Sequence, residues 1–267
     1  MKKTNISALL LAALLLIQLL CAPVSAVTAE PAADAQADAQ TASDNSAEDA
    51  AAEADSVLED QLLSSREQFS VAAKAALLID LNTNRVVYEQ DADERVYPAS
   101  LTKIMTCLIA LENGNLSDVV TVSESALADL DEDSSVAGLV VGEQMTLENL
   151  LYCMMVVSGN DACNVIAEHV AGSVTDFVRM MNQRAYELGC TNTHFNNPHG
   201  LHDESRYTTA RDLAIITQAA LKSENFRQIV DTYEYKLPDD NMRQNIPKLK
   251  TTNMLIYQSM SNSLYYP

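Results

Sequence analysis

The sequence predicts a domain of mixed α and β structure (α+β within the broad α/β class), with an antiparallel sheet, packed helices and a mainly helical subdomain. An apolar run at 75–80, a turn at Asn82-Thr83-Asn84 and a second run at 85–90 predict the first hairpin. Apolar positions from Ile104 to Leu111 predict a buried helix. Further helical patterns occupy residues 147–157, 162–170, 174–188 and 210–221.

Local signals indicate where several of these elements begin. Pro98 precedes the buried helix and places Ser100 in or near its first turn. Thr146 with Asn149, and Thr209 with Asp212, are typical N-caps. After Asp231, the alternation of Tyr233, Tyr235 and Leu237 predicts another strand, which turns at residues 239–241.

The chain divides into three parts by composition. Residues 1–26 have two lysines, an apolar run and Val24-Ser25-Ala26, which is typical of a cleaved signal peptide; an uncleaved anchor is the alternative. Residues 27–68 are acidic and alanine-rich, with no glycine, which predicts a disordered tether or a transient helix. Residues 69–267 are long enough for one domain with its own core.

Charge and cysteine content exclude some functions. The formal net charge is −20, so no nucleic acid is expected as a partner, because phosphate binding needs basic patches. The cysteines that follow the signal match no zinc spacing. We expect them to be small apolar core residues, although an exported chain could oxidise them. They are Cys107, Cys153, Cys163 and Cys190.

Two short motifs carry candidate chemistry. Ser100 and Lys103 form an S-x-x-K pattern at a predicted helix start, where one turn places both on one face. Ser158 and Asn160, with Gly159 between them, lie between two predicted helices, where a loop can present side chains to a cleft. Together they provide the serine, lysine, second serine and amide of an enzyme that activates its nucleophile with lysine. Either motif alone is common by chance.

Four blocks in order make the match specific from about Ala73 onward. On these blocks the chain resembles the serine-type D-Ala-D-Ala carboxypeptidases, the low-molecular-mass penicillin-binding proteins, and the resemblance implies the DD-peptidase/serine β-lactamase-like fold. The blocks are Pro98-Ala99-Ser100-Leu101-Thr102-Lys103-Ile104-Met105-Thr106, Val157-Ser158-Gly159-Asn160-Asp161-Ala162-Cys163, Thr191-Asn192-Thr193-His194-Phe195 with Asn197-Pro198-His199-Gly200-Leu201, and Tyr207-Thr208-Thr209-Ala210-Arg211-Asp212.

The resemblance implies roles for the motif residues. Ser100 would be the acylated nucleophile, with Lys103 accepting its proton and its backbone N–H forming half of an oxyanion hole. Ser158 would relay a proton to the leaving D-alanine, and Asn160 would bind the substrate amide. The implied substrate is a peptidoglycan stem peptide ending in D-Ala-D-Ala, with β-lactams as inhibitors and no metal or organic cofactor.

The same resemblance implies a place in the cell. A hydrolase of this kind would act in peptidoglycan biosynthesis and cell shape, outside the cytoplasm, either secreted or associated with the cell envelope after signal cleavage. Membrane or wall association would come through a C-terminal segment beyond this sequence.

The third motif of such enzymes, K-T-G on a strand beside the cleft, is absent from the sequence. The triplet at Lys250 reads Lys-Thr-Thr and lacks the glycine that allows close approach of a substrate backbone. We therefore expect a C-terminally truncated sequence with an incomplete sheet, an uncovered face of the central helix, poor stability and little activity.

Two other functions and one other site stay open. A class A-like β-lactamase would share the fold but normally carries S-D-N and a deacylating glutamate, neither of which is found here. A non-catalytic wall-binding or sporulation-associated relative would need none of the four motif residues.

Three histidines, His194, His199 and His202, lie within nine residues. A structural turn near the cleft explains them better than a metal site.

Overall fold

The computed structural model describes residues 71–128, 130, 134–253 and 256. All of them belong to the unit that runs from Asp60 to Pro267. The expected signal peptide at 1–26 and tether at 27–68 lie outside the described residues. Within the described residues, no helix is both long enough and apolar enough to cross a membrane.

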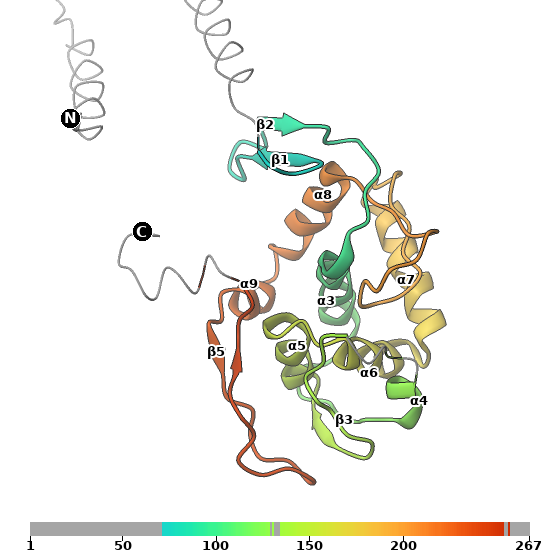
Figure 1. The fold of residues 1–267 in the computed structure, drawn as a ribbon, viewed down its shortest axis with the longest axis vertical. Helices are drawn as coiled ribbons and strands as arrows, with labels where there is room; N and C mark the ends of the chain where they lie inside the picture. The colour runs from blue at the N-terminus through green and yellow to red at the C-terminus, as the bar shows by residue number, and fades with distance from the viewer. Residues whose placement is uncertain (1–70, 129, 131–133, 254–255, 257–267) are drawn as a thin grey trace, which may run out of the picture. The chain divides into compact units, whose positions relative to one another are not determined.

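The chain first forms the predicted hairpin, at the top of Figure 1. Strands β1 (Ala76–Ile79) and β2 (Val86–Gln90) pair antiparallel, with Leu77 opposite Glu89. The turn forms because the Asp80 carboxylate accepts hydrogen bonds from the backbone N–H groups of Asn82 and Thr83. β1 borders an apolar groove of about 440 Å³, which the side chains of Leu101, Ile104 and helix α8 (Ala210–Ala220) also line.

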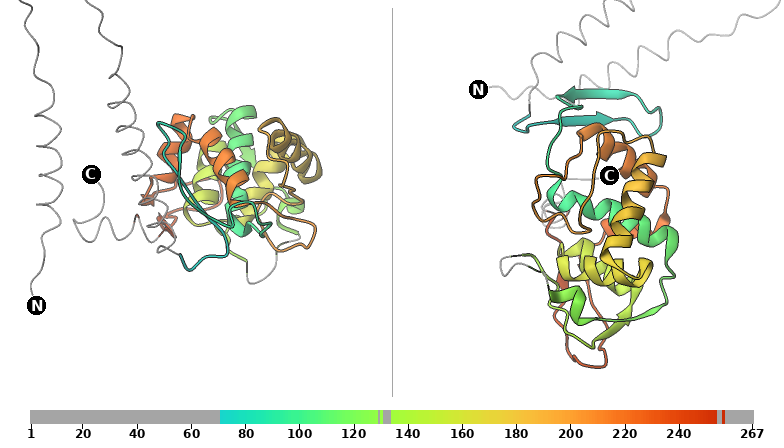
Figure 2. Two further views of the ribbon diagram at one scale, coloured as in Figure 1. Left: turned by 90° about the horizontal axis from the view of Figure 1, so that it is seen from above. Right: turned by 90° about the vertical axis from the view of Figure 1, so that its right-hand side faces the viewer.

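A central helix follows, and it carries the first motif. A short 3₁₀ turn, η1 (Ala99–Leu101), leads directly into α3 (Thr102–Asn113), so Ser100 precedes the α-helix by two residues. Most of α3 is buried, because five other helices pack against it: α5 (Leu147–Val156), α6 (Asn160–Ala171), α7 (Val174–Glu187), α8 and α9 (Glu224–Val230). Figure 2 shows this helix enclosed by the others, with the hairpin lying across α8.

The predicted helices of the middle of the chain are confirmed. They are α5 (Leu147–Val156), α6 (Asn160–Ala171), α7 (Val174–Glu187) and α8 (Ala210–Ala220), followed by α9 (Glu224–Val230). The N-caps also form: the hydroxyls of Thr146 and Thr209 accept from the backbone N–H groups of Asn149 and Asp212. These caps satisfy amides that would otherwise lack partners at the helix starts.

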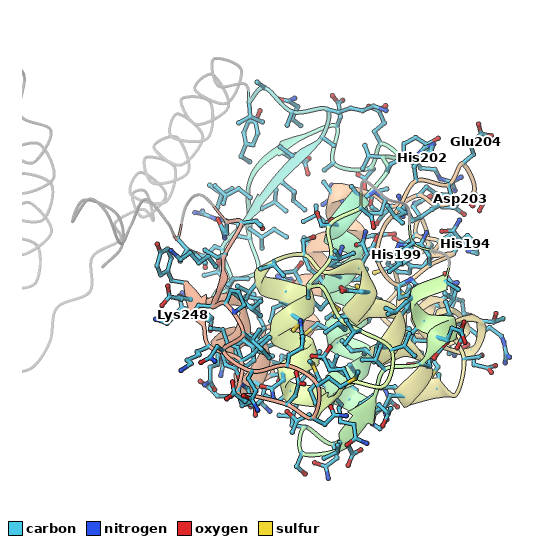
Figure 3. The ribbon with its side chains drawn as sticks, turned by 60° about the horizontal axis from the view of Figure 1, so that its bottom comes forward. His194, His199, His202, Asp203, Glu204 and Lys248 are labelled. Atoms are coloured by element: carbon cyan, nitrogen blue, oxygen red, sulfur yellow. The ribbon has the colours of Figure 1, made fainter. Side chains whose placement is uncertain are left out.

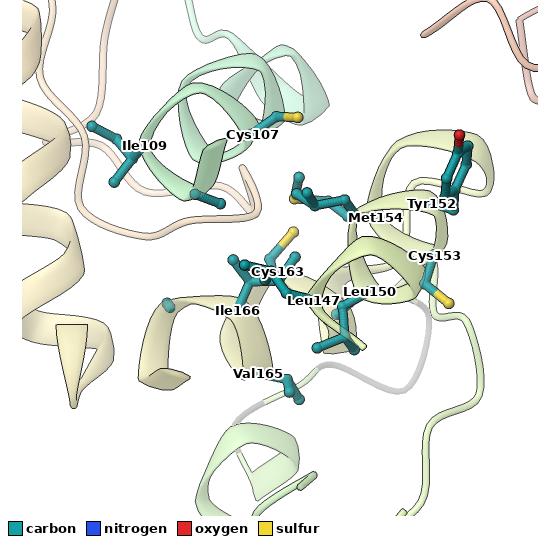
Figure 4. Close-up of a cluster of buried hydrophobic side chains, with 14 of the residues drawn as sticks. Cys107, Ile109, Leu147, Leu150, Tyr152, Cys153, Met154, Cys163, Val165 and Ile166 are labelled. Carbon is teal, nitrogen blue, oxygen red and sulfur yellow. The ribbon is translucent and has the colours of Figure 1, made fainter. Parts of the chain in front are cut away.

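The hydrophobic core lies where α3, α5 and α6 meet (Figure 4). Cys107, Met154 and Cys163 approach one another there, and each is fully buried. The four cysteines Cys107, Cys153, Cys163 and Cys190 are all free and buried, as expected of apolar core residues. Burial raises the pKa of the Cys153 and Cys163 thiols to about 12, so both stay protonated at neutral pH.

Two further strand pairs were only partly foreseen. β3 (Val119–Thr121) and β4 (Gln144–Thr146) pair within a stretch predicted to be mainly helical, and the short helix α4 (Glu124–Ala128) lies between them. Strands of three residues are too short to show a clear alternation of side chains. The strand after Asp231 is confirmed as β5 (Glu234–Tyr235), but it pairs with β6 (Leu249–Lys250) across a loop longer than the predicted turn.

Candidate active site

Ser100 is presented by a turn with unusual backbone geometry. The residue before it, Ala99, has φ of +48°, in the left-handed region that an alanine rarely adopts. The Ser100 side chain is exposed, whereas Thr102 and Lys103, at the start of α3, are buried. The turn therefore places an accessible hydroxyl directly above a buried lysine.

Lys103 is 3% exposed and lies among three oxygen atoms. Its Nζ atom is 3.2 Å from Ser100 Oγ, 2.7 Å from Asn160 Oδ1 and 2.8 Å from the backbone oxygen of His199. Burial is the main reason that its pKa is lowered, because desolvation penalises the ammonium form. The predicted pairing of Ser100 and Lys103 across one helical turn is thus present in the structure.

The three oxygen atoms can serve either protonation state of the amine. An ammonium has three N–H donors and can donate to Ser100 Oγ, Asn160 Oδ1 and the His199 carbonyl. A neutral amine has two N–H donors and one lone pair. In that form Asn160 Oδ1 and the His199 carbonyl, which can only accept, would take the two N–H groups, and the lone pair would face Ser100 Oγ as a general base requires.

The second motif completes the cluster from the other side. Ser158 Oγ lies 3.1 Å from Ser100 Oγ and can donate a hydrogen bond to it. Ser158 itself has φ of +60°, and Gly159 forms the N-cap of α6. Asn160 is buried and is the first residue of α6, not part of the loop in which it was expected. Its helical position fixes the amide that contacts Lys103.

Backbone strain at Ala99 and Ser158 is a feature that sequence reasoning missed. Non-glycine residues in sparsely populated backbone regions cost about 1–3 kcal/mol each and persist where the surrounding structure enforces them. Here one such residue lies directly before the candidate nucleophile, and the other is the second serine. Neither alanine nor serine carries a sequence signal for positive φ.

A third segment, the loop at 197–201, supports the site through its backbone. The Pro198 carbonyl accepts a hydrogen bond from Thr106 Oγ1 at 2.6 Å, one residue before the His199 carbonyl that contacts Lys103. Gly200 has φ of +99°, and a Cβ atom there would lie 2.0 Å from the Ala99 carbonyl oxygen. A glycine is therefore required for this loop to approach the turn that carries Ser100.

The three histidines occupy different environments along one loop (Figure 3). His199 Nδ1 accepts a hydrogen bond from the Leu201 N–H, whereas His202 lies edge-on to Tyr97, and His194 pairs through its backbone with Tyr207. Burial, then Lys103 and Arg206, lower the pKa of His199 to about 4. The contacts agree with a structural turn near the cleft, and no group of possible metal ligands is found among the described residues.

Lys250, the residue of the rejected K-T-G candidate, lies in β6 and pairs with Glu234 of β5. Its side chain is exposed. The next residue, Thr251, donates its N–H to the Tyr233 carbonyl, and Thr252 donates to the Val156 carbonyl of α5. The triplet thus serves to attach the β5–β6 hairpin to the helical part.

Known proteins are similar to this chain in sequence and in fold. The sequence profile of the D-alanyl-D-alanine carboxypeptidases, peptidase family S11, matches residues 62–264. The chain belongs to this family. Among curated relatives, D-alanyl-D-alanine carboxypeptidase DacF of Bacillus subtilis is 42% identical over 192 residues, which are 69% of this chain and 47% of that protein. DacC of Escherichia coli is 40% identical over 160 residues, 57% of this chain and 40% of that protein.

Solved structures confirm the predicted fold class. The Streptomyces K15 DD-transpeptidase superposes with a TM-score of 0.66 at 32% identity, covering 71% of this chain and 77% of that one. Penicillin binding protein 5 from Haemophilus influenzae gives 0.65 at 34% identity, covering 72% and 56%. This chain therefore has the DD-peptidase fold. It spans about half the length of the curated relatives it matches.

Proposed function

We propose that this chain is the catalytic part of a serine-type D-Ala-D-Ala carboxypeptidase that removes the terminal D-alanine from peptidoglycan stem peptides. The observation that carries the proposal is the contact of the buried Lys103 Nζ with Ser100 Oγ at 3.2 Å, with two acceptors taking the amine's own N–H groups. The names of its relatives, D-alanyl-D-alanine carboxypeptidases, point to the same reaction.

Acylation follows from this geometry. Lys103 takes the Ser100 proton as Ser100 Oγ attacks the carbonyl carbon of the penultimate D-alanine. Ser158, within hydrogen-bond distance of Ser100, passes a proton to the nitrogen of the leaving D-alanine as the peptide bond breaks. Lys103 returns to its neutral form, and the peptide is left as an ester on Ser100. The Asn160 amide nitrogen would orient the substrate by donating to a peptide carbonyl.

Deacylation requires a second nucleophile. A water molecule, deprotonated by Lys103, attacks the ester carbonyl and releases the shortened peptide from Ser100. An amine in place of water would give transpeptidation. The name of the Streptomyces relative, a DD-transpeptidase, makes this a second candidate outcome for the same ester. A β-lactam would acylate Ser100 by the same steps. Its leaving nitrogen stays tethered to the acyl group after ring opening, so it remains in the site, hinders the approach of water and keeps the ester attached.

The proposed function is tested by following Ser100 directly. The protein is incubated with a fluorescent penicillin, and peptide mass spectrometry locates the adduct; release of D-alanine from a peptide ending in D-Ala-D-Ala is measured alongside. We expect a long-lived adduct on Ser100 that is absent from Ser100→Ala. Ser205→Ala, which alters an exposed serine of the 197–207 loop, serves as the matched control and should label normally.

The outcomes separate the competing functions. Rapid hydrolysis of penicillin would favour a β-lactamase, because the ester would then turn over instead of persisting. A folded protein that forms no Ser100 adduct and releases no D-alanine would contradict the proposal and favour a wall-binding role. Chromatographic detection of cross-linked peptide in place of free acid would assign transpeptidation.

The cellular setting is part of the same proposal. A stem-peptide substrate lies outside the cytoplasm, which agrees with the signal-like residues 1–26. Hydrolysis of that substrate would contribute to cell-wall synthesis and cell shape. The protein would act either in secreted form or attached to the cell envelope. Fractionation of cells that express the chain with a C-terminal tag would show whether it is exported and whether residues 1–26 are removed.

A further inference from the structure

Two buried charged side chains lie behind the two acceptors of Lys103. Asp161 is adjacent in sequence to Asn160, whose Oδ1 accepts one N–H of Lys103. Arg206 donates to the carbonyl of Leu201, two residues from the His199 carbonyl that accepts the other. We propose that Asp161 and Arg206 are positioning residues that carry opposite charges near Lys103 and together adjust how readily it gives up its proton.

This proposal rests on the role proposed above for Lys103 as the base. It gives an indirect role, exerted through Lys103, to two residues that do not hydrogen-bond to Ser100. Opposite fixed charges near a titrating amine have opposite effects. A carboxylate stabilises the ammonium, whereas a guanidinium stabilises the neutral amine. The balance between the two decides the pH at which the base becomes available.

Asp161 is held in place by several backbone donors. It is 2% exposed, and its carboxylate accepts hydrogen bonds from the N–H groups of Ala137, Gly138 and Leu139 at 2.9, 2.9 and 3.0 Å. These bonds join the loop at 137–139 to the start of α6. Asp161 therefore combines two functions: it fixes the first turn of α6, including Asn160, and it places a negative charge that raises the pKa of Lys103.

Arg206 is an unusual buried cation. It is 1% exposed and donates to the Leu201 carbonyl and to Asn197 Oδ1, both of them uncharged acceptors. The negative charge of Asp203 stabilises the guanidinium, but Asp203 is exposed and accepts hydrogen bonds from Ser205. Burial lowers the pKa of Arg206, but a guanidinium stays charged in proteins. Its charge lowers the pKa values of both Lys103 and His199.

The remaining groups around Lys103 carry no charge at neutral pH. Burial raises the pKa of the Cys163 thiol of α6 to about 12, although the charge of Lys103 acts in the opposite direction. The thiol is therefore neutral at neutral pH. His199, with a pKa of about 4, is neutral as well. Among the described residues, α5, α7, α8 and α9 add no further charge that acts on Lys103. Asp161 and Arg206 are thus the two charged groups that adjust the pKa of Lys103 beyond the effect of burial.

The test replaces each charge by a neutral side chain of similar shape. Asp161→Asn keeps an oxygen acceptor, and Arg206→Gln keeps an N–H donor for the Leu201 carbonyl. The NMR titration of the Lys103 side chain, assigned with Lys103→Met, gives its pKa without reference to activity. We expect the midpoint to fall in Asp161→Asn and to rise in Arg206→Gln, by about 0.5–1 pH unit each.

The rate of penicillin acylation against pH gives the second measurement. Below the midpoint only the neutral amine reacts, so Asp161→Asn should be about three- to tenfold faster and Arg206→Gln slower by the same factor, with similar rates at high pH. A purely structural role would instead lower the high-pH rate and leave the midpoint unchanged. Glu143→Gln is the matched control, because Glu143 is a buried carboxylate that binds the Val140 N–H of the same loop.

The outcomes distinguish failure of this inference from failure of the proposed function. If wild-type protein forms no Ser100 adduct, the proposed function fails, and the NMR titration still tests the two charges. If labelling occurs but neither variant moves the midpoint, the inference is overturned. Should one variant not fold, the other decides alone, and Arg206→Lys, which retains the charge, should keep the wild-type midpoint.

Discussion

Lys103 and Cys107 lie one turn apart on α3, and both are buried, yet their pockets have opposite chemistry. Lys103, 3% exposed, contacts a hydroxyl, an amide oxygen and a backbone carbonyl. Cys107, 0% exposed, lies among apolar side chains such as Met154 (Figure 4). The first pocket arranges acceptors around one amine, whereas the second excludes water from a close-packed core.

The difference shows that burial alone does not make a residue reactive. Burial raises the pKa of the Cys107 thiol, and its apolar surroundings do not favour a thiolate. Burial lowers the pKa of Lys103, which suits the role of base proposed for it. If this is correct, the polar pocket and the apolar core can be disrupted independently.

The largest effect is expected from Lys103→Met, which removes the base. Ser100 acylation by penicillin should fall by about 10²–10⁴-fold. The free energy of unfolding should change by no more than about 2 kcal/mol, because relief from burying an amine offsets the loss of partners for two oxygens. Labelling rates and urea denaturation measure the two quantities. Lys248→Met, at an exposed lysine, is the control, and equal labelling of both variants would contradict the assignment.

Met154→Ala should disrupt the core and spare the site. Removing a fully buried methionine leaves a cavity and costs about 2–5 kcal/mol in the free energy of unfolding. The exposed Met242 provides the control, since Met242→Ala should cost less than about 0.5 kcal/mol. Urea denaturation measures both, and at low temperature the folded Met154→Ala protein should still label on Ser100. Loss of labelling without loss of stability would show that the two regions are coupled.

His199 should make stability depend on pH. Because its pKa is about 4, well below its ordinary value near 6.5, the unfolded chain binds the proton more readily. The neutral His199 therefore contributes up to about 3 kcal/mol to the free energy of unfolding. This contribution is complete above about pH 6.5 and is lost as the pH falls to 4. Unfolding free energies of the wild type and His199→Gln at several pH values test this. A variant with the wild-type slope over this interval would contradict it.

The smallest effect is expected from Cys107→Ser compared with Cys107→Ala. The serine hydroxyl would enter an apolar pocket, so the serine variant should be less stable than the alanine variant by about 1–2 kcal/mol. Neither variant should change the penicillin labelling rate. Equal stability of the two would show that a polar partner reaches this pocket, and the contrast with Lys103 would then be weaker.

Sequence patterns were sufficient for most of the elements and for naming the candidate site residues. The hairpin, α3, helices α5 to α8 and the threonine caps of α5 and α8 follow from local periodicity and capping signals. The two motifs supplied Ser100, Lys103, Ser158 and Asn160, which the structure brings together. Short strands such as β3 and β4 were missed, because they form by pairing residues about 25 positions apart, such as Val120 and Met145, and no local pattern marks them.

The sequence by itself determined which side chains could perform the chemistry, because residue type and spacing along a helix are local properties. The tertiary structure alone decided how they are held. The His199 carbonyl reaches Lys103 across 96 positions of chain, and Ala99 and Ser158 adopt positive φ only because of neighbouring segments. Asp161 and Arg206 acquire their proposed role from where the fold places them. Backbone oxygens and fixed charges act through distance, and only the folded chain sets those distances.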